Sequence, residues 1–260
     1  MLESAVEIYG TKAVLLIAGV LVGVLFGVTA QHSRFCLRAA TVEVAEGRLG
    51  PRLSVWLIAF SAGVLCVQSS IAFGWLNVIE ARQLATIGSI SGALIGGALF
   101  GIGMILARGC ASRLLILSSC GNLRALVTGL VLTLVAQASL RGVLSPMRET
   151  LAGIWTVPGG GARNLLEILG LSAWHAAVCA AFALALSFAW AHRNAVKVSH
   201  ALSAAGVGSA VGLGWLLTYL IAQNSFDVVT ISSVTFTGPS TDTLMAFVNA
   251  PDIPLGFGMG

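Results

Sequence analysis

Residues 88–125, GSISGALIGGALFGIGMILARGCASRLLILSSCGNLRA, decide the fold. The first part of this stretch, 88–107, carries no charge and is rich in Gly, Ala, Ile and Leu. A run of about 20 such residues is long enough to cross a hydrocarbon core as a helix. The second part, 108–125, brings arginines, cysteines and serines together before the next apolar run. Polar residues between two lipid-compatible segments suggest a functional element within a membrane fold.

The composition of the whole chain points to the same class. Of its 260 residues, 57% are hydrophobic and only 9% are charged, and the mean hydropathy is +0.94. A typical soluble domain has about 25% charged residues. The alternation of a membrane β-barrel is missing, so we expect an all-α integral membrane protein, a polytopic helical bundle. The net charge of +4 is spread over loops and indicates no nucleic-acid partner.

The apolar runs predict six membrane spans and a short polar helix. The short helix, 111–119, carries the polar residues of the opening stretch. Residues 41–52 are expected to form a solvated connection, and a loop containing Pro146 and Pro158 should follow the fourth span. The tail, 224–260, suggests a re-entrant or short helix and then the start of another span. The predicted spans are 13–31, 53–75, 88–107, 123–140, 168–191 and 200–222.

The distribution of basic residues predicts the orientation of these spans. Cytoplasmic loops carry an excess of Lys and Arg. With the N-terminus outside, nine basic residues fall inside: Arg34, Arg38, Arg48, Arg52, Arg108, Arg113, Arg124, Arg193 and Lys197. Five fall outside: Lys12, Arg82, Arg141, Arg148 and Arg163. We therefore expect a multi-pass protein of a bacterial-type inner membrane with its N-terminus outside.

The first and sixth spans resemble each other. Both place small residues four apart, and they end in Ala30-Gln31 and Ala222-Gln223 followed by a polar residue and serine. Five spans separate the two starts, so the second copy would be inverted, as in many secondary transporters. This predicts one transmembrane domain, 1–260, in which 1–195 form a first repeat. Residues 196–260 would begin a second repeat that is truncated or completed by a partner chain.

The segment Arg108-Gly109-Cys110-Ala111-Ser112-Arg113 is the main candidate site. Gly109 should allow a sharp change of direction, so that a short helix begins near Cys110. The first N–H groups of a helix attract anions, and half-helix ends do so in transporters. Arg108 and Arg113 add positive charge, and Cys110 and Ser112 add weak donors. The alternative is a cytoplasmic loop whose arginines only set the topology.

A second segment repeats this chemistry. Arg34 and Cys36 follow the Gly-rich first span, as Arg108 and Cys110 follow the third. Gly121 and Asn122 are expected to cap the short helix and the fourth span, and Asn122 is also kept as a candidate binding residue. In the tail, Ser240 or Thr241 would cap a half-helix, unless the hydroxyl-rich segment is an exposed loop.

Other chemistries lack their sequence signals. There is no Walker loop and no GxGxxG after a strand, so no cofactor is expected. The four histidines are scattered, and Cys110 and Cys120 lie ten residues apart, so no metal site is expected.

The motifs SRFCLRAA and GMILARGCASRLLILSSCGNLRALV resemble the YeeE/YedE family of membrane proteins, and FTGPSTDTL resembles its second half. The resemblance implies an hourglass-shaped helical fold that takes up thiosulfate, with inverted pseudo-symmetry. It implies that pore cysteines, matched here by Cys36 and Cys110, contact the anion in turn through S–H hydrogen bonds. A further family cysteine has no match in this chain. The family's usual partner is a small cytoplasmic sulfur carrier of the TusA type.

Two other functions stay open at this stage. Cys110 could be the thiolate of a membrane-embedded sulfurtransferase that carries a persulfide, since arginine and a helix end lower the pKa of a thiol. The anion could also be sulfite or a selenium species rather than thiosulfate. The leading expectation is a permease and not an enzyme.

Overall fold

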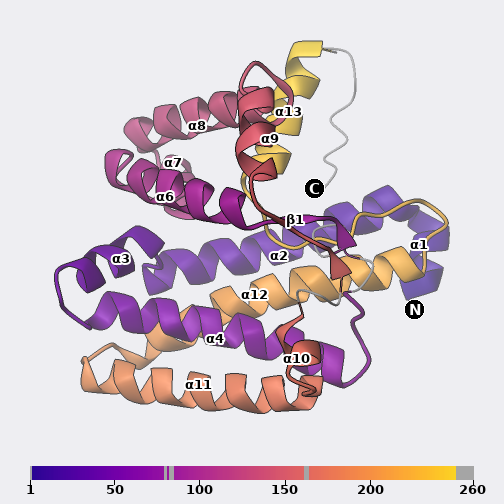
Figure 1. The fold of residues 1–260 in the computed structure, drawn as a ribbon. Coiled ribbons are helices and arrows are strands. Elements are labelled where there is room, and N and C mark those ends of the chain that lie inside the picture. Colours follow the sequence, from indigo (N-terminus) through magenta and orange to yellow (C-terminus); the bar gives the residue numbers. More distant parts are fainter. Residues whose placement is uncertain (1, 79–80, 82–84, 161–163, 250–260) are drawn as a thin grey trace. The chain divides into compact units, whose positions relative to one another are not determined.

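The computed structural model describes residues 2–78, 81, 85–160 and 164–249. Helices form almost all of its regular structure (Figure 1). The long helices are α2 (Thr11–Ser33), α4 (Pro51–Ala72), α6 (Ile90–Leu106), α8 (Leu123–Arg141), α11 (Ala173–Arg193) and α12 (Val198–Gln223). The shorter elements are α1 (Leu2–Tyr9), α3 (Leu37–Ala45), β1 (Gly88–Ser89), α7 (Ala111–Ser119), α9 (Ser145–Gly153), β2 (Thr156–Val157), α10 (Leu165–Ile168) and α13 (Thr237–Asn249).

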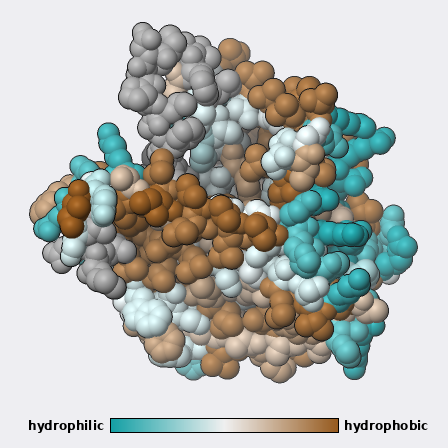
Figure 2. Space-filling model, turned by 180° about the vertical axis from the view of Figure 1, so that it is seen from behind, coloured by the Kyte–Doolittle hydropathy of each residue, from teal (hydrophilic) through white to brown (hydrophobic). Residues whose placement is uncertain are grey.

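The six long helices confirm the predicted membrane spans. Six helical segments in the described part of the chain are long and apolar enough to cross a membrane. Their bounds agree with the predicted ranges within a few residues, the largest difference being at the start of α11. Broad areas of hydrophobic side chains face outward on the side shown in Figure 2. Exposed large hydrophobic residues of the described chain include Leu106, Leu123 and Val178. A surface of this kind suits lipid, and the protein is a polytopic helical membrane protein.

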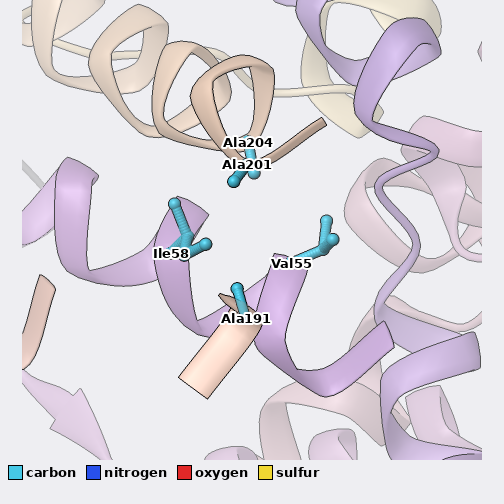
Figure 3. Packing of buried hydrophobic residues seen from close by; sticks show 5 residues of the cluster. All are labelled: Val55, Ile58, Ala191, Ala201 and Ala204. Atoms are coloured by element: carbon cyan, nitrogen blue, oxygen red, sulfur yellow. The ribbon is translucent and has the colours of Figure 1, made fainter. Parts of the chain in front are cut away.

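The helices α1–α4 and α10–α12 form one compact unit. Within it, α4 packs against both α11 and α12, and α12 also packs against α2. Val55 and Ile58 of α4 meet Ala191 of α11 and the two alanines Ala201 and Ala204 of α12 (Figure 3). Small residues let membrane helices approach closely, which explains why alanine dominates this cluster.

The contact between α4 and α12 depends on glycine. A Cβ atom added at Gly208 would lie 2.5 Å from the backbone nitrogen of Gly63 and would also overlap the carbonyl oxygen of Ala59. One turn further on, a Cβ at Gly212 would lie 2.6 Å from Cβ of Cys66. The two backbones are therefore close enough that only hydrogen fits between them, as in GxxxG-type packing.

Helices α2 and α12 lie antiparallel. The Oγ1 of Thr11, at the start of α2, lies 2.9 Å from Oγ of Ser225, just after α12. At the other end, the ring centroids of His32 and His200 are 5.3 Å apart. The two helices are the predicted first spans of the two repeat copies, and an inverted repeat requires them to run in opposite directions. The repeat itself stays a prediction.

The helices α6–α9 and α13 form the second compact unit. Its long helix α8 packs against α7, α9 and α13. Strand β1 pairs with β2 in a two-residue antiparallel ladder, a small addition to the all-helical prediction. Ser89 caps α6 by accepting a hydrogen bond from the Gly92 amide, and Ser91 donates to the Leu151 carbonyl.

Three local predictions differ from the structure. Residues 41–45 belong to helix α3 rather than to a solvated connection, and the Glu43 carboxylate accepts a hydrogen bond from the Leu53 amide at the start of α4. The loop after α8 contains helix α9, because Pro146 suits a first helical turn. In α13, Ser240 and Thr241 donate to carbonyls of Phe236 and Gly238, so neither residue caps the helix. The span expected to begin after residue 250 lies outside the described residues.

Candidate functional site

The turn after α6 is made by Arg108, not by Gly109. Arg108 has φ of 58°, in the left-handed region, whereas the prediction gave this role to Gly109. The Arg108 amide donates to the carbonyl of Ile105 and the Gly109 amide to that of Met104, which is the Schellman pattern at a helix end. Gly109 lies close to Leu114 instead, since an added Cβ would lie 3.2 Å from Cδ2 of that side chain and would require it to shift slightly.

The turn places Cys110 at the start of α7, as predicted. Cys110 is the N-cap residue, its backbone is extended, and it is 4% exposed. Its Sγ lies 3.3 Å from Oγ of Ser112, which is also buried. Within the described chain, the Cys110 side chain accepts no capping hydrogen bond from α7. The thiol therefore lies at the positive end of a nine-residue helix next to a hydroxyl group.

The same arrangement occurs after α2. Arg34 has φ of 55°, and its amide and that of Phe35 donate to the carbonyls of Gln31 and Ala30. Cys36 is then the N-cap of α3, again with an extended backbone, and α3 also has nine residues. Among described residues, its side chain likewise makes no capping bond to the helix. Each compact unit thus contains one left-handed arginine followed, two residues later, by a cysteine that starts a short helix.

Arg38 has a buried polar atom that the sequence did not predict. It occupies the second position of α3, as Ser112 does in α7. Its Nε atom is fully buried and has no hydrogen-bond partner among the described residues. A buried guanidinium nitrogen without a partner is costly in a protein interior. The sequence signal that could have indicated this is the place of Arg38 two residues after Cys36.

Asn122 and Gly121 take the capping roles that were predicted for them. Asn122 is the N-cap of α8, and its Oδ1 accepts a hydrogen bond of 3.1 Å from the Ala125 amide. Gly121 has φ of 85° directly after the C-cap Cys120. Asn122 thus shapes the start of α8, next to the end of the short helix. Arg113, on α7, is partly buried.

The other cysteines have different surroundings. Cys66 packs against Gly212 in the contact between α4 and α12. Cys120 and Cys179 are exposed. In the described segments, no group of three or more His, Cys, Asp or Glu side chains could hold a metal ion. The described chemistry is therefore that of thiols, hydroxyls, arginines and helix N-termini, which together favour a small anion over a cation.

Comparison with known proteins gives the family. The family model described as Sulphur transport matches residues 32–260. The chain is 27% identical over 219 residues to the thiosulfate transporter TsuA of Spirochaeta thermophila, covering 78% of this chain and 63% of that protein. It is 32% identical over 98 residues to the thiosulfate transporter TsuA of Escherichia coli K12, covering 38% of this chain and 26% of that protein.

The chain thus spans less than two thirds of the length of either relative. The family match includes both cysteine segments and continues through the described part of α13. It agrees with the resemblance of the motifs around Cys36 and Cys110. The chain belongs to the Sulphur transport family, which is the YeeE/YedE family of membrane proteins.

Proposed function

We propose that the protein imports thiosulfate, or a closely related sulfur anion, across the bacterial inner membrane. The observation that carries this proposal is the local equivalence of Cys36 and Cys110. Each thiol starts a nine-residue helix, and each follows a left-handed arginine by two residues. The names of the two relatives, both thiosulfate transporters, support the choice of anion.

The chemistry of a thiol suits transport better than tight binding. An S–H group is a weak donor with a polarizable sulfur atom. A permeating ion must be bound well enough to enter a site and weakly enough to leave it. Two thiols that hydrogen-bond the anion in turn meet this condition, and the positive ends of α3 and α7 offset its charge.

The remaining site residues support the two thiols. Arg34 and Arg108 bring positive charge to the turns, and Arg113 adds more on α7. Ser112 supplies a hydroxyl group 3.3 Å from the Cys110 sulfur. Gly109 leaves room for Leu114 beside the turn, and Asn122 fixes the start of the next helix. We assign the last two residues to positioning.

Three wider proposals follow from the same reading. Residues 1–195 and 196–260 belong to two inverted repeat copies. The N-terminus lies outside, which places the ends of α2 and α6, with Cys36 and Cys110 beyond them, on the cytoplasmic side. A small cytoplasmic sulfur carrier of the TusA type receives the imported anion. The antiparallel pair of α2 and α12 supports the first of these proposals.

The test is uptake of radiolabelled thiosulfate by proteoliposomes that contain the purified full chain. We expect uptake above that of empty liposomes. Excess unlabelled sulfite or selenium oxyanions should reduce this uptake if they use the same path. Uptake no faster than in empty liposomes overturns the proposal for this chain. Mass spectrometry after thiosulfate exposure examines the alternative of a sulfurtransferase, which requires a persulfide on Cys110.

A further inference from the structure

Two histidines from different helices meet at the end of α2. The rings of His32 and His200 are 5.3 Å apart between centroids and nearly perpendicular, at 86°. His32 is in the last turn of α2, and His200 is in the first turn of α12. No local pattern in the sequence pairs them, because they lie far apart in the chain, in the two predicted repeat copies.

The surroundings of this pair are positively charged. Arg34 lies two residues after His32, and Lys197 lies three residues before His200. Arg34 follows α2 directly, and Lys197 is the N-cap of α12. Four cationic or titratable side chains therefore gather where α2 ends and α12 begins.

The helices packed around the pair add more positive than negative charge at this end. Phe35 and the start of α4 pack in the same cluster as the end of α11, which locates these helix ends together. The carboxylate of Glu43 accepts hydrogen bonds from the Arg52 and Leu53 amides at the start of α4. Glu46 pairs with Arg48. The charged and titratable groups that α3, α4 and α11 contribute here are Arg38, Glu43, Arg52, His192 and Arg193.

We propose that His32, Arg34, Lys197 and His200 form a pH-dependent binding site for the transported anion at the end of α2, just before Cys36 in the chain. This inference rests on the proposed function for the identity of the anion, and its position makes it a site where the anion pauses on the proposed cytoplasmic side. Histidine is the side chain whose ordinary pKa lies nearest to physiological pH, so an anion bound between the two rings can draw protons onto them. Binding of a divalent anion favours protonation of both rings, and protonation of both rings in turn favours binding of the anion.

An anion fits this site better than a metal cation does. Two imidazoles alone could ligate a transition metal, but Arg34 and Lys197 repel a cation at that position. The same two residues attract an anion through charge-assisted hydrogen bonds, which are stronger than neutral ones. Of the described carboxylates in this region, Glu43 and Glu46 already have partners.

The test follows the histidine ring resonances of the purified full chain by NMR during a pH titration, with and without sodium thiosulfate. His32→Gln and His200→Gln variants assign the two resonances. We expect thiosulfate to raise the midpoint of both titrations by about one pH unit, which corresponds to roughly tenfold tighter binding for each ring that is protonated. His175, exposed at the start of α11 and so at its opposite end, is the internal control and should not move.

Two outcomes overturn the inference. Unchanged midpoints for His32 and His200 at saturating thiosulfate would exclude the site. So would an equal rise at His175, which would indicate a general effect of ionic strength. Neither result depends on uptake, so a chain that fails to transport thiosulfate can still show the site, and a transporting chain can still lack it.

Discussion

Arg34 and Arg108 hold the same left-handed backbone conformation, with φ of 55° and 58°, and each precedes a cysteine N-cap by two residues. Glycine is the usual residue at such a helix end, because a Cβ atom makes the left-handed conformation unfavourable by about 1 kcal/mol. Both units therefore keep an arginine where glycine would be more stable. We propose that both arginine side chains are kept at these turns because they attract the anion.

The effect of the arginine side chain on uptake can be measured separately from the effect of its backbone conformation on stability. We expect Arg108→Gly to raise the free energy of unfolding by up to about 1 kcal/mol, because glycine is unstrained at positive φ. We expect the same variant to lose most thiosulfate uptake. Thermal unfolding and uptake in proteoliposomes measure the two effects.

The control for this pair of measurements is Ala195→Gly. Ala195 is the third described residue other than glycine with positive φ, at 53°, and it ends α11 by the same pattern. It should gain stability without any loss of uptake. Full uptake by Arg108→Gly would show that the arginine side chain is not needed.

The close contact of α4 with α12 predicts a strong effect of a single methyl group. Gly208→Ala should destabilise the protein by about 2 kcal/mol or more, since the new Cβ meets the backbone of Ala59 and Gly63. Gly23→Ala is the matched control, because an added Cβ there meets no described atom within 4 Å. Equal melting temperatures for the two variants would contradict this packing.

Asn122 was expected to bind substrate or to cap α8, and the two roles predict different effects of substitution on stability and uptake. Asn122→Ala should cost about 1 kcal/mol of stability, as the loss of an N-cap usually does. Asn122→Ser keeps a capping oxygen, so its stability and its uptake should both stay close to the wild type. Normal stability of Asn122→Ser combined with lost uptake would instead assign Asn122 to the anion.

The proposed orientation can be tested by labelling single cysteines introduced near the ends of two helices. Ser4 of α1 and Ser199 of α12 are both exposed. In a Cys120→Ala/Cys179→Ala background, a membrane-impermeant maleimide applied to intact cells should label Ser4→Cys and leave Ser199→Cys unlabelled. The reverse labelling pattern would place the N-terminus in the cytoplasm.

Local signals allowed much of the fold to be predicted from the sequence. Long uncharged runs gave the spans, and Asn122 marked the start of α8 because a side-chain oxygen there can accept from the helix. The turn after α6 was predicted, but it was assigned to Gly109 rather than to Arg108, since a left-handed arginine is rare. Helix α9 was missed because Pro146 suggested a loop, although proline is tolerated in a first turn.

Contacts between distant segments could not be predicted in this way. The pairing of His32 with His200 depends on how α2 packs against α12. No sequence motif around either histidine predicts this contact. The burial of the Arg38 Nε atom likewise depends on tertiary packing. The cysteines were easier to find, because arginine, cysteine and a helix start recur together along the sequence.

The central claim is that Cys36 and Cys110 carry the anion, and uptake of radiolabelled thiosulfate by cysteine variants tests it most directly. Cys36→Ala and Cys110→Ala should each reduce uptake to the level of empty liposomes, because each removes one S–H donor from the path. Cys179→Ala, which changes an exposed cysteine of α11, should transport normally. Normal uptake by Cys110→Ala, at equal amounts of folded protein, would contradict the account.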